Sequence, residues 1–558
     1  MQMRKMLFSC FSWFLVLYSS RVSFGLAKEE TAVGGVHQEE EKIARDVIAK
    51  NPILFIGGMG ASTIDATLDK KDVVHPFCWH QAENYTVWLS VSSLLPGVSD
   101  CFLDNFKLRW KKNAGSSTAV SPVSSDSSED VDEAQQEAPL ILDETEVQPY
   151  MQHDRIPVGT ASLSDGLVKS LWDKFADVAT SKFGYDSPRQ MNNIVYDFRK
   201  SPREWLPDGT FARVKANIER YVDEFNNGKP ALLVSLSEGS NFVHQFLSLY
   251  IGSGQQRDGD EQGGGRENGD NDKRTIWGDA WRRKYVVHWL SLSGPFGGTP
   301  ELTRVAFFPQ PIDVYHLPQL LAYIKLRDLR DLSVSFPSTL LGMPSYFGED
   351  EVMLVGPAPS TTGEDEGTAE TGQSKDDALT SSIKGVLTRR PSPNKSRWET
   401  NTRTKTITAK RQSTKKRGKE YTQLNIVDAF RDAGQPQTAE LYEMQHAYRF
   451  DSLAAPQVPV TCVYGIGTPT LKNMTYGSGW DREATDFGYE DGDGVVPARS
   501  LRRCQEWSHQ ENQPHITMFA VEGAAHGDPL HRHEVLKVFE DLLADISKKN
   551  VDEEEVFI

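Results

Sequence analysis

A serine between an apolar run and a helical pattern constrains this chain more than any other feature. Residues 231–236 are apolar and β-prone and end at Ser237, and the apolar spacing from Phe242 onward predicts a helix. A nucleophilic serine occupies such a strand–turn–helix elbow, where the sharp turn requires small residues two positions before and after it. Ser235 and Gly239 meet this requirement, although serine replaces the glycine usual at the first position. The pattern predicts a nucleophile at the end of a strand in an α/β sheet.

Candidate partners for Ser237 follow in the order that this kind of fold requires, first an acid and then a histidine, each after a later strand. The apolar run 458–464 predicts a strand, and the loop after it reaches Asp493. A further strand, predicted over 515–521, leads to His526. We therefore predict a catalytic triad of Ser237, His526 and Asp493.

Each partner has a weaker alternative nearby. Asp493 is preferred over Asp491 because it lies next to the returning apolar pair 495–496. His531 and His533 fall inside the amphipathic pattern of the last helix. The Asp-Gly-Asp-Gly run also resembles a cation loop, but it lacks the regular oxygen spacing of a calcium-binding loop. No metal site is predicted.

The rest of the core alternates strand and helix. Strands are predicted over 52–58, 194–198 and 286–292, and helices over 163–183 and 211–225. Such alternation is typical of an α/β fold, a mostly parallel sheet with helices on both faces.

The amino terminus has the pattern of a targeting segment. Arg4 and Lys5 precede an apolar stretch over 6–18, which is too short to span a bilayer and is followed by small residues. We predict a cleaved signal peptide over 1–27. An uncleaved anchor is the alternative, because Arg21 is unusual so close to a cleavage site.

Cysteines and sequons agree with a secreted protein. The cysteines that remain after the signal are Cys78, Cys101, Cys462 and Cys504. An even number in a secreted chain favours two disulfides, and proximity favours pairing the first with the second and the third with the fourth. The glycosylation sequons are at Asn84, Asn394 and Asn473.

Three polar inserts carry much of the charge. The net charge of −17 and the lack of a basic face in the globular part argue against nucleic-acid binding. Residues 114–139, 252–273 and 356–419 are too poor in apolar side chains to fold, and we predict disordered loops on one core. The third insert turns basic, with dibasic clusters at 389–390 and 415–417, and is a predicted site for a processing protease.

Together these motifs resemble one family. The matching segments are 68–78, 86–89, 94–96, 100–105, 196–199, the elbow, 291–298, 462–465, 468–469, the Asp493 loop, Cys504 and His526. They resemble the lecithin:cholesterol acyltransferase and lysosomal phospholipase family of α/β-hydrolases. The resemblance covers the core from 51 to 546 and is interrupted only by the inserts.

The resemblance implies additional parts around the triad. It implies a membrane-binding subdomain over 75–110 closed by Cys78–Cys101, a disulfide from Cys462 to Cys504 at the acid loop, and a lid over 301–335. The membrane contacts it implies are Trp79, Trp88, Leu89, Leu94 and Leu95, and an ordinary core hairpin is the alternative for this loop.

The resemblance also implies an oxyanion hole made by the backbone N–H groups of Met59 and Glu238. Family members tend to have an apolar residue at the position of Glu238. A carboxylate there would oppose a developing oxyanion unless it points away.

The predicted function is that of a serine phospholipase or acyltransferase without a cofactor, in the secretory pathway or a vacuolar lumen and peripheral on membranes. An acyl-enzyme on Ser237 would pass a fatty-acyl chain from a phospholipid to water or to a sterol. The alternatives are a non-catalytic lipid-binding homologue, which the intact triad disfavours, and a small-ester or peptide hydrolase, which the tryptophan-containing loop disfavours.

Overall fold

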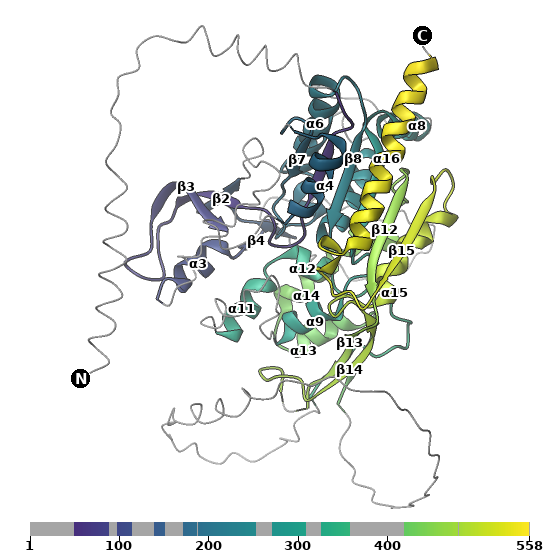
Figure 1. Cartoon of the computed structure of the whole chain (residues 1–558). Coiled ribbons are helices and arrows are strands. Elements are labelled where there is room, and N and C mark those ends of the chain that lie inside the picture. The colour runs from purple at the N-terminus through teal and green to yellow at the C-terminus, as the bar shows by residue number, and fades with distance from the viewer. Residues whose placement is uncertain are drawn as a thin grey trace, which may run out of the picture.

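The computed structural model describes residues 49–88, 97–113, 139–150, 171–186, 188–252, 270–308, 325–357, 418–477 and 479–556. At its centre is a six-stranded sheet in which all neighbouring strands run parallel (Figure 1). In spatial order the strands are β15 (Ile516–Glu522), β12 (Val460–Ile466), β9 (Val286–Leu292), β8 (Ala231–Leu236), β1 (Ile53–Ile56) and β7 (Met191–Ile194). The predicted α/β-hydrolase fold is confirmed.

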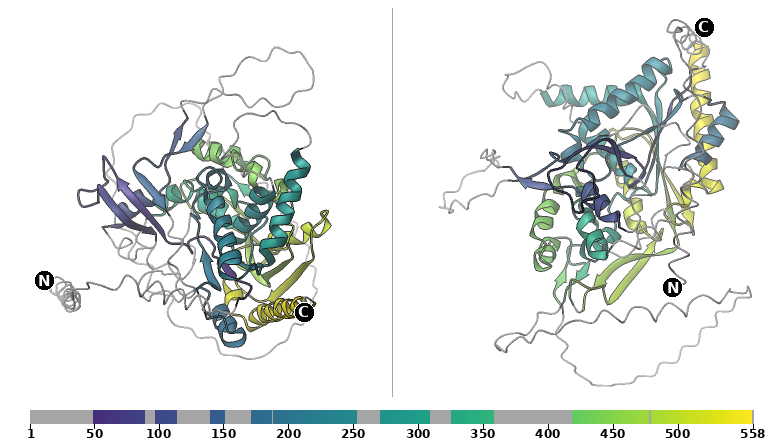
Figure 2. Two further views of the ribbon diagram at one scale, coloured as in Figure 1. Left: turned by 90° about the horizontal axis from the view of Figure 1, so that it is seen from above. Right: turned by 90° about the vertical axis from the view of Figure 1, so that its left-hand side faces the viewer.

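Helices cover both faces of this sheet because alternate strand residues point to opposite sides (Figure 2). Leu54 of β1 packs in a cluster with Phe211 and Phe242, whereas Phe55 packs in the other cluster with Phe175 and Phe539. The first face is covered by α6 (Thr210–Glu219), α7 (Glu238–Gln245) and α8 (Asp270–Tyr285), and the second by α4 (Asp173–Phe183) and α16 (His533–Val556).

One predicted boundary is wrong, and a second falls outside the described residues. The strand predicted over 194–198 is β7, which ends at Ile194, so Tyr196 lies in the loop at its carboxyl end. β7 pairs only with β1 at the edge of the sheet, and an edge strand tolerates polar residues such as Asn192 and Asn193. The helix predicted to begin at 163 begins at Asp173 within the described residues, after a turn at 171–172.

A small antiparallel subdomain stands out from the sheet, on the left of Figure 1. Its elements are β2 (Ile64–Asp69), β3 (Gln81–Trp88), α3 (Ser99–Phe106), β4 (Trp110–Lys112), β5 (Leu140–Leu142) and β6 (Val147–Tyr150). The predicted Cys78–Cys101 disulfide ties the turn between β2 and β3 to α3. Because β3 pairs with β2 and β2 with β6, the unit extends beyond the predicted 75–110 range.

A cap built from the segments between β9 and β12 packs with a second sheet (Figure 1). Its helices are α9 (Pro300–Phe307), α11 (Leu326–Ser333), α12 (Pro337–Leu341), α13 (Ile426–Asp432) and α14 (Pro436–Glu443). The second sheet has the order β11 (Glu420–Tyr421), β10 (Leu354–Val355), β13 (Thr468–Thr475) and β14 (Asp486–Gly492). The short elements that complete the chain are α5 (Pro202–Trp205), η2 (Arg220–Phe225), η3 (Phe246–Ile251), η4 (His446–Tyr448), η5 (Phe450–Ser452), α15 (Ala498–Leu501), η6 (Arg502–His509) and η7 (Asp528–Leu530).

Several predictions fall on residues outside the described ranges. These are the signal peptide, most of the three inserts, the centre of the lid (309–324), and Leu89, Leu94, Leu95 and Asn394. Within the described residues, no helix has the length and apolar character needed to cross a bilayer.

The two ends of the third insert are joined within the fold. β10 and β11 pair antiparallel, and the N–H of Gly356 donates to the carbonyl of Lys419 at 2.8 Å. Across the insert, β9 pairs with β12 and β10 pairs with β13. After a cut between 358 and 417, these strand pairs would still join the first fragment to the second.

We predict that trypsin cuts first in this insert, where the dibasic clusters gather, and that the fragments stay associated. Cys78–Cys101 lies before the cut and Cys462–Cys504 after it, so neither disulfide joins the fragments and two bands are expected on a denaturing gel even without reductant. One species is expected on gel filtration, because the strand pairs hold the pieces together. Fragments that separate under native conditions would contradict this arrangement.

Candidate active site

The elbow predicted at Ser237 is present. β8 ends at Leu236, and Ser237 has φ 53° and ψ −127°, a conformation that costs a non-glycine residue about 1–3 kcal/mol. α7 begins at the next residue. The N–H of Ser237 donates to the carbonyl of Leu292 in β9 at 2.8 Å, which holds the turn against the neighbouring strand.

Ser237, His526 and Asp493 are connected by hydrogen bonds. Nε2 of His526 lies 2.9 Å from Oγ of Ser237, and Nδ1 of His526 lies 2.7 Å from Oδ2 of Asp493. The alternative acid, Asp491, lies in β14 and accepts instead from the N–H of Gly467 at 2.7 Å. The three residues predicted from chain order are thus the three that the fold brings together.

Asp493 is fixed by its own loop. Its Oδ1 accepts from the N–H groups of Val495 and Val496 at 3.0 and 2.7 Å, which leaves Oδ2 for His526. The side chain is fully buried. The glycine at 494 is needed because φ is +87° there. The acidic, glycine-rich run is therefore a turn that presents one carboxylate to a histidine.

Ser293 is a supporting residue that sequence reasoning missed. It follows β9, and its Oγ donates to the carbonyl of His526 at 2.9 Å. This bond fixes the loop that carries the histidine. Ser293 lies inside the family-like segment 291–298, but no local pattern indicates which part of the chain it contacts.

The loop after β1 lies directly against the elbow. A Cβ added to Gly58 would be 2.9 Å from Cβ of Ser237 and 3.4 Å from its Oγ. Met59 follows Gly58, and the N–H of Glu238 is the first of α7, where no carbonyl of the same helix can accept it. Both predicted oxyanion donors thus belong to backbone adjacent to the nucleophile.

The side chain of Glu238 has no partner in the described part of the chain. Its Oε2 is enclosed and makes no hydrogen bond. Burial raises the pKa of Glu238 well above its usual value, and the negative charge of Asp197 raises it further. The neutral acid is therefore the favoured form of this carboxyl group.

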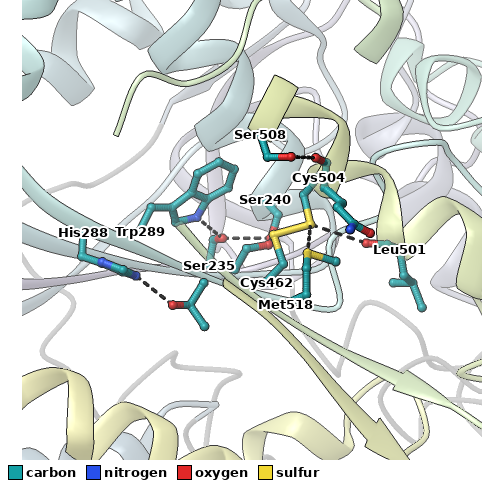
Figure 3. Close-up of a disulfide and its surroundings, with 12 residues drawn as sticks. Ser235, Ser240, His288, Trp289, Cys462, Leu501, Cys504, Ser508 and Met518 are labelled. Carbon is teal, nitrogen blue, oxygen red and sulfur yellow. Dashed lines mark hydrogen bonds between the residues drawn. A yellow bond between two sulfur atoms is a disulfide. The ribbon is translucent and has the colours of Figure 1, made fainter. Parts of the chain in front are cut away.

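Ser235 and Ser240, on either side of Ser237 in the sequence, belong to a buried serine network (Figure 3). Oγ of Ser240 is 2.8 Å from Oγ of Ser235 and 2.9 Å from Oγ of Ser291, and Nε1 of Trp289 donates to Ser235 at 2.8 Å. A glycine at 235 would leave the buried indole N–H without this acceptor. The unusual serine at the first elbow position thus has a structural role.

The predicted second disulfide joins Cys462 of β12 to Cys504 of η6 (Figure 3). The Asp493 loop lies between these cysteines in the sequence. Sδ of Met518, on β15, is 3.4 Å from Sγ of Cys504. The Cys462–Cys504 disulfide fixes η6, which follows the Asp493 loop, against β12, which precedes that loop.

Of the predicted membrane contacts, one described residue is exposed and one points inward. Trp79 is 59% exposed. Trp88 is partly buried, stacks on Phe106 with ring centroids 5.0 Å apart, and donates from Nε1 to the carbonyl of Gly60 at 2.8 Å. The ring of Trp88 packs in the aromatic core of the subdomain and its N–H is already bonded, so Trp79 is the more exposed of the two, and membrane contact by Trp88 stays a prediction.

The two described sequons differ in accessibility. Asn84 is exposed on β3, and its Oδ1 accepts from the hydroxyl of Tyr150 at 2.6 Å. Asn473 lies within β13, between β10 and β14, and its amide donates to the carbonyl of Val352 at 3.4 Å. Asn84 is therefore the more accessible of the two described glycosylation sequons.

The sequence model of one family, described as lecithin:cholesterol acyltransferase, matches residues 84–537. The chain belongs to this family. It is 24% identical to the lysosomal phospholipase A and acyltransferase of Canis lupus familiaris, over 85% of this chain and 87% of the relative. It is 22% identical to the phosphatidylcholine-sterol acyltransferase of Mus musculus, over 83% of this chain and 78% of the relative. Among solved structures, a chain of the Tle4–Tli4 complex is similar over 90% of this chain and 99% of its own length, with a TM-score of 0.42 and 10% identity.

Gly239→Ala tests the close packing of the elbow. An added Cβ would lie 2.5 Å from the carbonyl oxygen of Gly57 and 2.6 Å from that of Ile56, and neither backbone atom moves without shifting the loop after β1. We expect about 1–3 kcal/mol lower stability in denaturant unfolding. Labelling of Ser237 by a fluorophosphonate should slow by at least about tenfold, because the reactive geometry is displaced.

The matched control is Gly348→Ala, where the nearest side-chain atom would be 3.9 Å from the added Cβ. It should change neither stability nor labelling measurably. Equal behaviour of the two variants would show that packing at Gly239 does not position the nucleophile.

Proposed function

We propose that this protein is a serine phospholipase and acyltransferase. The observation that carries the proposal is the hydrogen-bonded chain from Ser237 through His526 to Asp493 in a member of the lecithin:cholesterol acyltransferase family. Relatives named as phospholipase A and acyltransferase, and as phosphatidylcholine-sterol acyltransferase, support a phospholipid as the acyl donor. Water or a sterol then accepts the acyl chain.

In the proposed mechanism, Nε2 of His526 takes the proton of Ser237 as Oγ attacks the ester carbonyl carbon of the lipid. Asp493 orients the imidazole and stabilises the imidazolium. The N–H groups of Met59 and Glu238 bind the oxyanion, each contributing roughly 3–4 kcal/mol. The imidazolium then protonates the departing lysophospholipid alcohol. Finally, His526 deprotonates water or a lipid alcohol, which attacks the acyl-enzyme and releases Ser237.

The triad variants test the chemistry. Ser237→Ala and His526→Ala should lower fatty-acid release from phosphatidylcholine vesicles by at least about 10⁴-fold, because triad members act as a unit. Asp493→Asn should cost about 10⁴-fold, because the amide favours the wrong imidazole tautomer. Lipid analysis with and without cholesterol in the vesicles identifies the acceptor.

Ser240→Ala is the matched control for these variants. Its hydroxyl is buried behind the elbow, so the variant should lose about 1–3 kcal/mol of stability but remain active. A fully active Ser237→Ala protein would refute the mechanism, whereas a wild type as inactive as Ser237→Ala would favour a non-catalytic, lipid-binding role.

We also propose that the tip of the small subdomain contacts the lipid surface. Around the Cys78–Cys101 disulfide, the large apolar side chains that are exposed are Val74, Phe77, Trp79 and Val98. Exposed apolar groups in a disulfide-tied loop suit insertion into a headgroup layer. The two disulfides, the exposed sequon at Asn84 and the signal-like amino terminus support a secretory-pathway or vacuolar location.

Replacing Phe77 and Trp79 with Ser should weaken vesicle binding by roughly 10- to 100-fold, because each ring is 59% exposed and contributes its buried area on insertion. Hydrolysis of a soluble short-chain ester should change less than about twofold. Tyr489→Ser is the control, since this aromatic is 61% exposed but lies on β14, in the second sheet. Equal losses of vesicle binding in both proteins would argue against a dedicated membrane-facing tip.

A further inference from the structure

Glu238 follows Ser237 directly in the elbow and is the first residue of α7. The strand before it and the pair Gly239-Ser240 after it are buried, whereas Ser237 and Glu238 are both partly exposed. The N–H of Glu238 is also one of the proposed oxyanion donors, so its carboxyl group is attached to the backbone beside the developing negative charge.

No group in the described part of the chain neutralises this carboxyl. Oε2 is enclosed without a hydrogen bond, and no lysine, arginine or histidine forms an ion pair with Glu238. β1 and β8, which pack against the start of α7, contain only uncharged residues. On α7 itself, the ring of His244 is buried and bonded to the carbonyl of Ala454.

The charges at the end of β7 are already paired. Arg199 binds Asp197 through two bonds, Nε to Oδ1 at 2.9 Å and Nη2 to Oδ2 at 2.7 Å. Burial acts to raise the pKa of Asp197, but the charge and hydrogen bonds of Arg199 outweigh it and the pKa is lowered. Lys200 pairs with Glu144 and Asp208. Glu238 thus faces a permanent anion, while the nearby cations have other partners.

A buried carboxylate without donors, close to another anion, is strongly disfavoured against its neutral form. Burial and the charge of Asp197 act in this direction on the pKa of Glu238. As a neutral acid, Glu238 adds no charge to the oxyanion site. Once ionised, it adds a negative charge to the residue whose N–H is a proposed oxyanion donor, and repulsion between like charges slows oxyanion formation.

We propose that Glu238 must be a neutral carboxylic acid for Ser237 to be acylated, and that loss of its proton to solvent at higher pH switches the enzyme off. Glu238 thus affects the oxyanion through its own charge, without bonding to the substrate. This inference rests on the proposed function and adds a pH limit specific to this chain, because an apolar residue at this position, as the family resemblance implies, cannot ionise.

The first test is the pH dependence of kcat/KM between pH 5 and 9 on a soluble short-chain ester, which avoids any pH dependence of membrane binding. The wild type should lose activity at least tenfold on the alkaline side. Glu238→Gln, which has the same shape but no charge, should lack this decline and exceed the wild type at the highest pH. Glu238→Met gives a second neutral variant if the amide perturbs folding. A parallel decline in wild type and both variants, or no decline in wild type, overturns the proposal.

The matched control is Glu301→Gln. Burial also raises the pKa of Glu301, but its carboxylate pairs with Arg304, three residues further along α9. This variant should keep the alkaline decline of the wild type. Loss of the decline in Glu301→Gln would show that the effect is not specific to Glu238.

A second test does not depend on activity. Because the folded state holds the proton of Glu238 more tightly than the unfolded chain does, folding is favoured below the unfolded pKa and stability is lost as the pH rises through the folded pKa. The Tm advantage of Glu238→Gln over wild type should therefore grow as the pH rises above about 4.3. A constant Tm difference overturns the neutral-acid assignment. If wild type and Ser237→Ala are equally inactive at every pH, the proposed function fails, while this melting comparison still decides the state of Glu238.

Discussion

The whole site depends on the strained backbone of Ser237, which is held in place by packing from two directions. On one side, Gly239 lies so close to the carbonyl groups of Ile56 and Gly57 that a methyl group would not fit. On the other side, Ser235 is hydrogen-bonded to Ser240 and to the indole of Trp289. A cost of about 1–3 kcal/mol in the dihedrals persists only where the surroundings fix the turn in this way.

Two carboxyl groups near the nucleophile differ in the hydrogen-bond donors that surround them. Asp493 is fully buried, but it receives two backbone N–H groups and the imidazole of His526, so its negative charge is compensated. Glu238 has an enclosed oxygen with no donor, and the negative charge of Asp197 opposes its ionisation. Separation of two carboxyl groups by environment is a general way for one site to keep one charged and the other neutral.

Much of this arrangement could be predicted from the sequence, because its signals are local. The apolar run before Ser237 and the small residues around it define the elbow. The order of acid and histidine along the chain then selects Asp493 and His526. A strand predicted over 286–292 is β9 with the same bounds, since a buried central strand is mostly apolar.

The errors and omissions concern contacts between distant segments. The predicted strand begins at 194 and so misses most of β7, because Asn192 and Asn193 are polar. Asn192 is buried, and its amide donates to the hydroxyl of Tyr221, a contact that the sequence does not indicate. The serine network joins three positions on β8, β9 and α7 that have no pattern in common. The missing partner of Glu238 likewise becomes visible only when the neighbours of α7 are known.

Trp88 shows why the small subdomain has to be considered together with the catalytic core. Its indole N–H bonds to Gly60, the residue after the proposed oxyanion donor Met59, while its ring stacks on Phe106 of α3. Phe106 in turn accepts from Arg199 through its carbonyl at 2.9 Å, and Arg199 holds Asp197. The subdomain that presents Phe77 and Trp79 to solvent is thus bonded to the oxyanion loop on one side and to the Asp197 pair on the other. Trp88 therefore connects the small subdomain to the catalytic core. Its replacement should lower the rate of hydrolysis of soluble and of vesicle substrates alike.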